Sequence, residues 1–221
     1  MDVLFHAWPY GGLVLATVLL VLLLRAPRPS DPAWVLKLLW PMYLLHQFEE
    51  HGIDLHGEHY AFLGGLCSTL GFSSLAACPA DPGFIFAVNA LGCWVAFALP
   101  LFYAETRPLV AACAWGIPIV NAVTHIGSAI AHGAYNPGVF TSVVLFVPLS
   151  LWMLRTVVRA GVVTTAEIPR VIATGVLTHA VLLGSLVLRM RGLPYFAFFG
   201  VNVVNGLWPL VLGRRSHILG E

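Results

Sequence analysis

Long apolar runs are the feature that most limits how this chain can fold. Each is close to the roughly 20 residues that a helix needs to cross ~30 Å of hydrocarbon. Backbone polar groups in hydrocarbon must be paired within the protein, so runs of this length are expected to be helices. Seven occur, over residues 8–24, 33–51, 83–103, 108–130, 138–156, 168–190 and 194–213. The pattern predicts an all-α, polytopic bundle of transmembrane helices with about seven spans.

Composition supports this class of protein. Only 10% of the 221 residues are charged and 59% are hydrophobic, whereas soluble domains carry about 25% charged residues. The formal net charge of +1 indicates no basic surface for nucleic acid and no acidic tail for a cationic partner. The expected partner is therefore the lipid bilayer, with a lipid-like substrate as a further option. The oligomeric state stays open.

The chain is expected to form a single membrane domain over residues 1–221. The first thirty residues lack a positive leading segment and a small-x-small cleavage site, so residues 8–24 are interpreted as a retained span rather than a signal peptide. The polar motifs described below lie within residues 33–156. The first span and the last two are expected to be peripheral to this core.

Lysine and arginine predict the orientation, because cytoplasmic loops carry an excess of both. With the N-terminus outside, only Arg189 and Arg191 lie on the outer side. The other nine basic residues then lie on the cytoplasmic side: Arg25, Arg28, Lys37, Arg107, Arg155, Arg159, Arg170, Arg214 and Arg215. The prediction is N-out and C-in, with the long second loop, residues 52–82, outside.

Two cysteines, Cys67 and Cys78, lie in that outer loop. In an oxidising compartment they can pair as a disulfide; two free thiols are the alternative. Their spacing indicates neither a zinc ribbon nor a thioredoxin-type site. Cys93 and Cys113 fall inside spans and are interpreted as small core residues.

Polar groups at the end of the second run are the strongest functional signal. His46, Glu49 and Glu50 follow a long apolar segment, and a helix rotation of ~100° per residue places the two carboxylates on either flank of His46. A charged group at the bilayer centre costs about 2.5–3.5 kcal/mol. The cost falls when such groups pair, bind a cation or line a wet cavity. This segment therefore predicts a functional site.

A second polar group follows in the fourth run. Asn121 and His125 share a helix face at i, i+4, and His132 lies seven residues further on the same face. A strong turn signal follows this run, with Asn136, Pro137 and Gly138 in sequence. We expect His46, Glu49, Glu50 and His125 to converge, with Asn121 and His132 at the rim.

These residues resemble the HXXEE-motif membrane proteins, a bacterial family of unassigned function described by three signatures. The signatures match His46-x-x-Glu49-Glu50, Asn121-x-x-x-His125 and Tyr135-Asn136-Pro137-Gly138, in that order. The resemblance implies a shared site and a location in a bacterial inner or plasma membrane. It implies no reaction. The first span and the last two lie outside the signatures, so His179 in the sixth run gains nothing from it.

The residue types suit a transition metal. Carboxylates and imidazoles from different helices are ligands of Zn, Fe and Mn. Candidate ligands are His46, Glu49, Glu50, His125 and His132, and the minimal set is His46, Glu50 and His125. Glu49 and Glu50 are also the catalytic candidates, with Glu49 bridging a second metal or acting as a general base. Glu50→Ala is expected to empty the site and His132→Ala only to lower its affinity.

Other polar residues are assigned supporting roles. Tyr135 and Asn136 are expected to shape the turn, and His179 is an intramembrane histidine without an assigned partner. His51, His56 and His59 directly follow the carboxylates, and the latter two are expected to be solvated unless they cover the site. His6 and His217 are expected at the surface.

Three functions stay open from the residues alone. The first is an integral membrane metalloenzyme that acts on a lipid or other apolar substrate, either a zinc-type hydrolase or a di-iron-type oxidoreductase. The second is a proton- or ion-coupled carrier with a His/Glu relay, although no inverted repeat is visible. The third is a polar knot in which these groups only satisfy one another.

Overall fold

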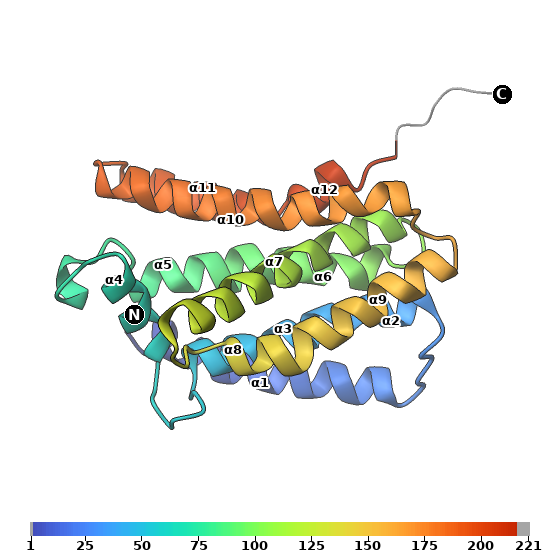
Figure 1. Cartoon of the computed structure of the whole chain (residues 1–221), viewed down its shortest axis with the longest axis horizontal. Helices are drawn as coiled ribbons and strands as arrows, with labels where there is room; N and C mark the ends of the chain where they lie inside the picture. The colour runs from blue at the N-terminus through green and yellow to red at the C-terminus, as the bar shows by residue number, and fades with distance from the viewer. Residues whose placement is uncertain (1, 216–221) are drawn as a thin grey trace.

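Helices make up nearly all of the regular structure in the computed structural model, which describes residues 2–215 and the side chains of residues 4–215 (Figure 1). Within that range no β-strand forms, and Ile53 and His59 make an isolated antiparallel bridge. The predicted all-α class is therefore confirmed. The helices are α1 (Asp2–Leu24), α2 (Pro32–Lys37), α3 (Leu39–His51), α4 (Ala61–Thr69), α5 (Pro82–Phe86), α6 (Trp94–Tyr103), α7 (Pro108–His132), α8 (Val139–Thr141), α9 (Val147–Arg159), α10 (Ile168–Met190), α11 (Tyr195–Asn205) and α12 (Trp208–Leu212).

In the part of the chain that the structure describes, five helical segments are long and apolar enough to cross a membrane. They are Leu4–Leu24, Pro82–Tyr103, Pro108–His132, Val139–Arg159 and Thr165–Met190, which correspond to five of the seven predicted spans. Two of them contain π-helical turns, at Ala87–Cys93 between α5 and α6 and at Ser142–Phe146 between α8 and α9. Length and composition thus support a membrane location.

The other two predicted spans are each divided into two short helices. The run 33–51 forms α2 and α3, and the run 194–213 forms α11 and α12. α2 ends at Lys37 and α11 ends at Asn205, in each case four residues before a proline, Pro41 or Pro209. Proline has no N–H, and its ring clashes with the carbonyl four residues earlier, so the helix is interrupted there. The number of membrane passes stays a prediction.

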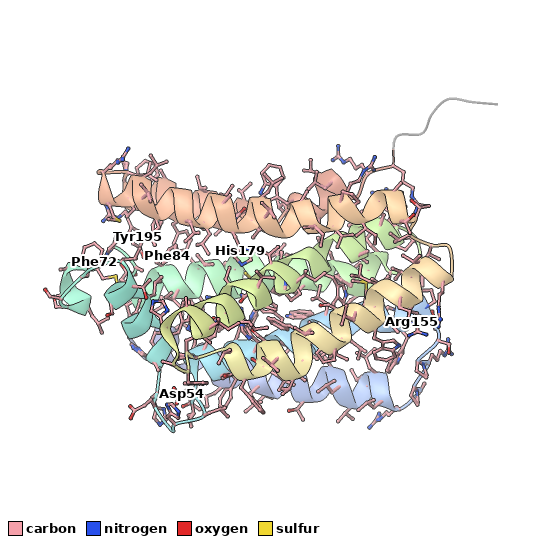
Figure 2. All side chains as sticks on the ribbon, in the orientation of Figure 1. Asp54, Phe72, Phe84, Arg155, His179 and Tyr195 are labelled. Atoms are coloured by element: carbon pink, nitrogen blue, oxygen red, sulfur yellow. A yellow bond between two sulfur atoms is a disulfide. The ribbon has the colours of Figure 1, made fainter. Side chains whose placement is uncertain are left out.

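The helices run nearly parallel to the long axis of the molecule in three layers (Figure 1). α10 and α11 form one outer layer, α5, α6 and α7 form the middle, and α1, α3 and α9 form the opposite side. The described chain starts at one end of the bundle, and α12 points toward the other. Arg155 lies at that second end, whereas Asp54 and Tyr195 lie at the first (Figure 2). This separation agrees with the predicted charge asymmetry; which end faces the cytoplasm stays a prediction.

The middle layer contacts both outer layers closely. On one side, Trp115 is fully buried and its Nε1 donates to the carbonyl of Leu36 on α2 at 3.0 Å. On the α10 side, a Cβ added to Gly116 would lie 1.8 Å from the Val171 carbonyl oxygen, and one added to Gly175 would lie 2.0 Å from that of Gly116. Only glycine permits this approach, so α7 and α10 are held backbone to backbone.

The long loop over residues 52–82 folds as α4 followed by a short return segment at one end of the bundle. Cys67 and Cys78 form a disulfide within it, which confirms the bridge that was left open above. Cys93 is half-buried and Cys113 is buried, and both are free thiols. Cys67 belongs to the same buried apolar cluster as Leu63 of α4, Phe84 of α5 and Phe198 of α11.

Candidate metal centre

Three ligand-bearing side chains meet between α3 and α7. His46 and Glu50 lie one turn apart on α3, and His125 comes from the second half of α7. All three are buried, with exposed fractions of 0%, 4% and 7%. One potential ligand atom from each lies within 4.8 Å of the others. His46, Glu50 and His125 therefore lie together, as expected from the sequence.

Glu50 stands at the centre of the group. Its Oε2 lies 3.2 Å from His46 Nε2, and its Oε1 lies 3.0 Å from His125 Nε2. A third imidazole, that of His51, places Nε2 3.6 Å from Oε2. One carboxylate is therefore surrounded by three rings in an interior where an isolated charge is expensive.

Thr141 at the end of α8 determines which nitrogen of His46 carries hydrogen. The Thr141 hydroxyl lies 2.5 Å from Glu49 Oε2, a distance that requires a hydrogen between the two oxygens. An ionised carboxylate only accepts, so Thr141 donates. His46 Nδ1, 2.8 Å from the same hydroxyl, must then be the donor to it. Neutral His46 therefore presents the lone pair of Nε2 to Glu50.

Asn136 has the same effect on His125. Its Nδ2 donates to the His125 backbone carbonyl at 3.0 Å, which fixes the orientation of the amide. Its Oδ1 can then only accept, and it lies 2.7 Å from His125 Nδ1. Neutral His125 therefore carries its hydrogen on Nδ1 and points the Nε2 lone pair at Glu50.

The group is thus a cluster of acceptors. Two imidazole lone pairs and a carboxylate face one another, and His46 Nε2 has no hydrogen-bond donor among the described residues. Such a cluster is stable when a proton is added to an imidazole or when a cation is shared by the three. Histidine ligands of metals commonly donate their other N–H to a protein acceptor, as both rings do here.

Glu49, although adjacent to Glu50, faces a different environment. Its Oε1 accepts from the Tyr135 hydroxyl at 3.0 Å and the Phe140 N–H at 3.1 Å. Its Oε2 accepts from the Thr141 N–H at 2.8 Å and from the Thr141 hydroxyl. Burial raises the pKa of Tyr135, so this hydroxyl remains a donor. Glu49 thereby ties α3 to α8 and lies outside the three-residue group.

His51 is oriented by a chain of amide side chains. Trp94 Nε1 donates to Gln47 Oε1 at 2.8 Å, and Gln47 Nε2 donates to Asn89 Oδ1 at 2.9 Å. Asn89 Nδ2 then lies 2.9 Å from the Ile85 carbonyl and 3.3 Å from His51 Nε2. Since each link has one possible donor, the chain ends with His51 Nε2 as an acceptor.

Gly138 closes the cluster from the side of the turn. Its φ of +96° lies in the left-handed region. A Cβ built there would lie 2.6 Å from His125 Cε1, 2.8 Å from His46 Cε1 and 3.0 Å from Glu50 Cγ. No residue with a side chain can occupy this position without displacing all three.

A cavity of about 350 Å³ opens beside the cluster. Glu50, His51 and His125 form part of its polar wall. Most of the remaining lining is apolar, with Phe62, Phe84, Ile117, Leu182 and Leu186 as examples from α4, α5, α7 and α10, while α11 contributes Asn202 and Asn205. The last two predicted spans therefore supply a wall of the cavity next to the cluster.

The remaining predicted residues lie around the cluster or away from it. His132 is exposed, and its Nδ1 bonds to the carbonyl of Ser128 on its own helix. Asn121 donates to the Tyr43 hydroxyl at 2.9 Å and lines the cavity. His179 also lines the cavity, and Figure 2 shows it on the side of α10 that faces the middle layer.

The loop histidines contact aromatic residues. The His56 ring lies 4.5 Å from that of Tyr135, measured between centroids, and His59 Nδ1 lies 3.1 Å from the Tyr10 hydroxyl. The ring of His6 lies 4.9 Å from that of Tyr60. His217 lies outside the described residues.

Sequence reasoning missed several residues that the geometry makes important: Thr141, Gln47, Asn89 and Trp94. Of these four residues, only Thr141 occupies a position that indicates its role in the sequence. It follows the turn by three residues, at the place where an apolar run begins, and a hydroxyl there can reach back to the preceding helices. The amide chain links residues 42 positions apart in sequence, so no local spacing indicates it.

Fold and site together define a class: an all-α protein with membrane-type helices and a buried cluster of two histidines and a glutamate. The family described as "Protein of unknown function with HXXEE motif" matches residues 37–153, more than half of the chain. This chain belongs to that family. No curated protein and no solved structure matches it.

Proposed function

We propose that this protein binds one divalent transition metal ion through His46 Nε2, His125 Nε2 and the Glu50 carboxylate. The observation that carries the proposal is the directed pair of hydrogen bonds at the two Nδ1 atoms, to Thr141 and Asn136. Both bonds orient a lone pair toward the same carboxylate. A shared cation removes the repulsion between these acceptors and offsets the burial of Glu50.

The ligand set favours Zn, Fe or Mn. Two histidines and one carboxylate bind catalytic zinc in hydrolases and non-haem iron in oxygenases, with coordination positions left open for water or substrate. Zinc would supply Lewis-acid chemistry and activation of water, whereas iron or manganese would supply redox chemistry. Because the four acceptor sites of Glu49 are engaged by Tyr135, Phe140 and Thr141, a single-metal centre is better supported than a di-metal one.

Glu49 acts in this proposal as a positioning residue. It accepts from the Thr141 hydroxyl, which in turn accepts from His46 Nδ1. This relay of carboxylate, hydroxyl and imidazole raises the basicity of the ligating nitrogen and holds the ring in place. A role for Glu49 as general base would require the carboxylate to leave these partners.

The adjoining cavity supports a metalloenzyme that acts on a lipid or other apolar substrate. Its volume of about 350 Å³ lies within the ~300–1,000 Å³ typical of small-molecule sites. Its lining is mainly apolar, with the convergent polar groups Glu50 and His125 at one wall. An apolar substrate bound in this cavity would therefore lie beside the metal.

A His/Glu proton relay is the second candidate. The observation that favours it is the third imidazole, since His51 Nε2 lies 3.6 Å from the carboxylate that His46 and His125 also contact. A protonated imidazole satisfies the acceptors as a cation does. The two candidates differ in one measurable property, because only the metal centre requires a stoichiometric metal ion.

Elemental analysis of detergent-purified protein tests the proposal. The wild type, stripped with chelator and reconstituted separately with Zn, Fe and Mn, is expected to hold about one ion per chain for at least one metal. Glu50→Gln, which keeps the shape of the side chain, is expected to hold none. His132→Ala is the control and is expected to hold as much as the wild type, because His132 bonds to Ser128 on its own helix.

Thermal unfolding gives a second readout. A ligand that binds the folded state raises its melting temperature in proportion to the logarithm of its concentration. The metal should therefore stabilise the wild type and His132→Ala but leave Glu50→Gln unchanged. A wild type that neither holds nor responds to any of the three metals would reject metal binding and leave the proton relay.

A further inference from the structure

The wall of the cavity formed by α10 and α11 carries polar side chains that already donate hydrogen bonds within the protein. Thr178 donates to the Thr174 carbonyl and Asn205 Nδ2 donates to the Thr178 carbonyl, each at 2.8 Å. His179 Nδ1 lies 2.8 Å from the Gly175 carbonyl, which only accepts. All three residues line the cavity.

The side chain of Asn202 has a hydrogen-bond acceptor that no described residue uses. Its side chain is 2% exposed, and its Nδ2 donates to Ser185 Oγ at 2.9 Å and to the Phe198 carbonyl at 2.8 Å. The bond to the carbonyl fixes the amide, so the remaining atom is Oδ1. This oxygen is buried and has no partner in the described part of the chain. A buried acceptor of this kind requires a donor from a ligand or from water.

His179 adds a second acceptor to the same wall. Because Nδ1 carries the hydrogen, the neutral ring exposes a lone pair on Nε2. The apolar surroundings favour that neutral form. Thr178, His179 and Asn202 therefore offer lone pairs to the cavity and no free side-chain hydrogen.

From this pattern we infer that the cavity binds an amphiphile whose polar group is a hydrogen-bond donor, either a hydroxyl or an amino group, for which Asn202 Oδ1 and His179 Nε2 are the available acceptors. The inference rests on the proposed function for its meaning as a substrate site, since the same cavity reaches Glu50 and His125. A carboxylate, phosphate or ketone would place an acceptor against acceptors. Fatty acids are thereby disfavoured at this wall.

Paired ten-carbon probes test this specificity. Chelator-stripped protein in detergent is equilibrated with 1-decanol, decylamine, decyl methyl ether or decanoate at equal mole fraction, and the bound fraction is measured by native mass spectrometry. The ether keeps the oxygen but lacks the hydrogen. The wild type is expected to bind the alcohol or the amine about tenfold more tightly than the ether, the factor that one buried hydrogen bond contributes.

Two variants assign the preference to the wall. Asn202→Leu and His179→Phe are expected to bring the ratio of ether to donor dissociation constants toward one. Val204→Ala is the control, because Val204 lies on α11 but is 61% exposed. Should Asn202→Leu fail to fold, His179→Phe decides, since it leaves the internal bonds of Asn202 intact. The alcohol and amine arms distinguish a neutral polar group from a charged one.

A ratio near one for both donors in the wild type, or decanoate bound as tightly as decanol, would overturn the inference. The same measurements on Glu50→Gln separate it from the metal proposal. If the protein holds no metal but the donor preference persists in Glu50→Gln, the cavity specificity stands and the metal centre falls. If metal binds but the donor preference is missing, the metal centre stands and the cavity specificity falls.

Discussion

Gly138 packs directly against the imidazole of His125, so that a Cβ added to the glycine would lie 2.6 Å from Cε1 of the ring. The turn that carries Gly138 therefore shapes the cluster as much as the ligands do. It brings Thr141 to His46 and Asn136 to His125, and each contact orients a nitrogen lone pair.

Gly138→Ala should disrupt the metal centre, because the added methyl group displaces His46, His125 and Glu50 together. Metal content should fall to near zero, measured by elemental analysis. Gly192→Ala is a matched control, since Gly192 has a similar φ of +100° but a Cβ there meets nothing within 4 Å. Equal metal loss in both variants would show that backbone strain, rather than the contact, is responsible.

Thr141→Val should weaken metal binding about 10–100-fold, the usual effect of removing a hydrogen-bond partner of a ligand. The substitution keeps the shape and removes the hydroxyl that accepts from His46 Nδ1. Thr141→Ser should restore most of the affinity, which competition with a chelator dye measures. The control is Thr17→Val, which removes an exposed hydroxyl bonded to the Leu13 carbonyl. Unchanged affinity in Thr141→Val would argue against the tautomer assigned to His46.

The two adjacent glutamates should respond differently to the same change. Glu49→Gln replaces an oxygen that accepts two hydrogen bonds by an amide that donates, so thermal stability should drop by the equivalent of about 1–3 kcal/mol. Metal should still bind, with lower affinity. Glu50→Gln should lose the metal. Complete metal loss in Glu49→Gln with unchanged stability would instead identify Glu49 as a ligand.

Thiol labelling should distinguish the four cysteines. In denaturant without reductant, only Cys93 and Cys113 should react, because Cys67 and Cys78 are bridged. After reduction all four should react, as counted by intact-mass spectrometry. Removing the bridge should also loosen α4 and lower stability by about 2–3 kcal/mol for a loop of this size, measured against Cys113→Ser. Labelling of Cys67 before reduction would contradict the bridge.

A fluorescent reporter fused after Glu221 should fluoresce in the cytoplasm, and an alkaline phosphatase at the same position should be inactive. The reason is that nine of the eleven basic residues are predicted to lie on that side of the membrane. Fusions made after Arg191, at the other end of α10, should show the opposite pattern. Phosphatase activity at the C-terminus would reverse the proposed orientation.

Much of this architecture follows from the sequence alone. Apolar length predicts helices because hydrocarbon leaves the backbone no other partner. Spacing at i, i+4 predicts that His46 and Glu50 share a face, and the buried polar groups predict that His125 joins them. The interruptions at residues 37 and 205 are also local, since each precedes a proline by one helical turn.

Tertiary structure alone determines that Glu49 and Glu50 have different partners. Glu49 and Glu50 differ by one residue, so periodicity places both near His46 but does not say which neighbour each will meet. That depends on the turn after α7, which folds back and delivers Tyr135 and Thr141 to Glu49 while Glu50 meets His125. Likewise, α10 and α11 line the cavity because of contacts between residues far apart in the chain. Helical periodicity determines which face a residue occupies, whereas the packing of the helices determines what that face contacts.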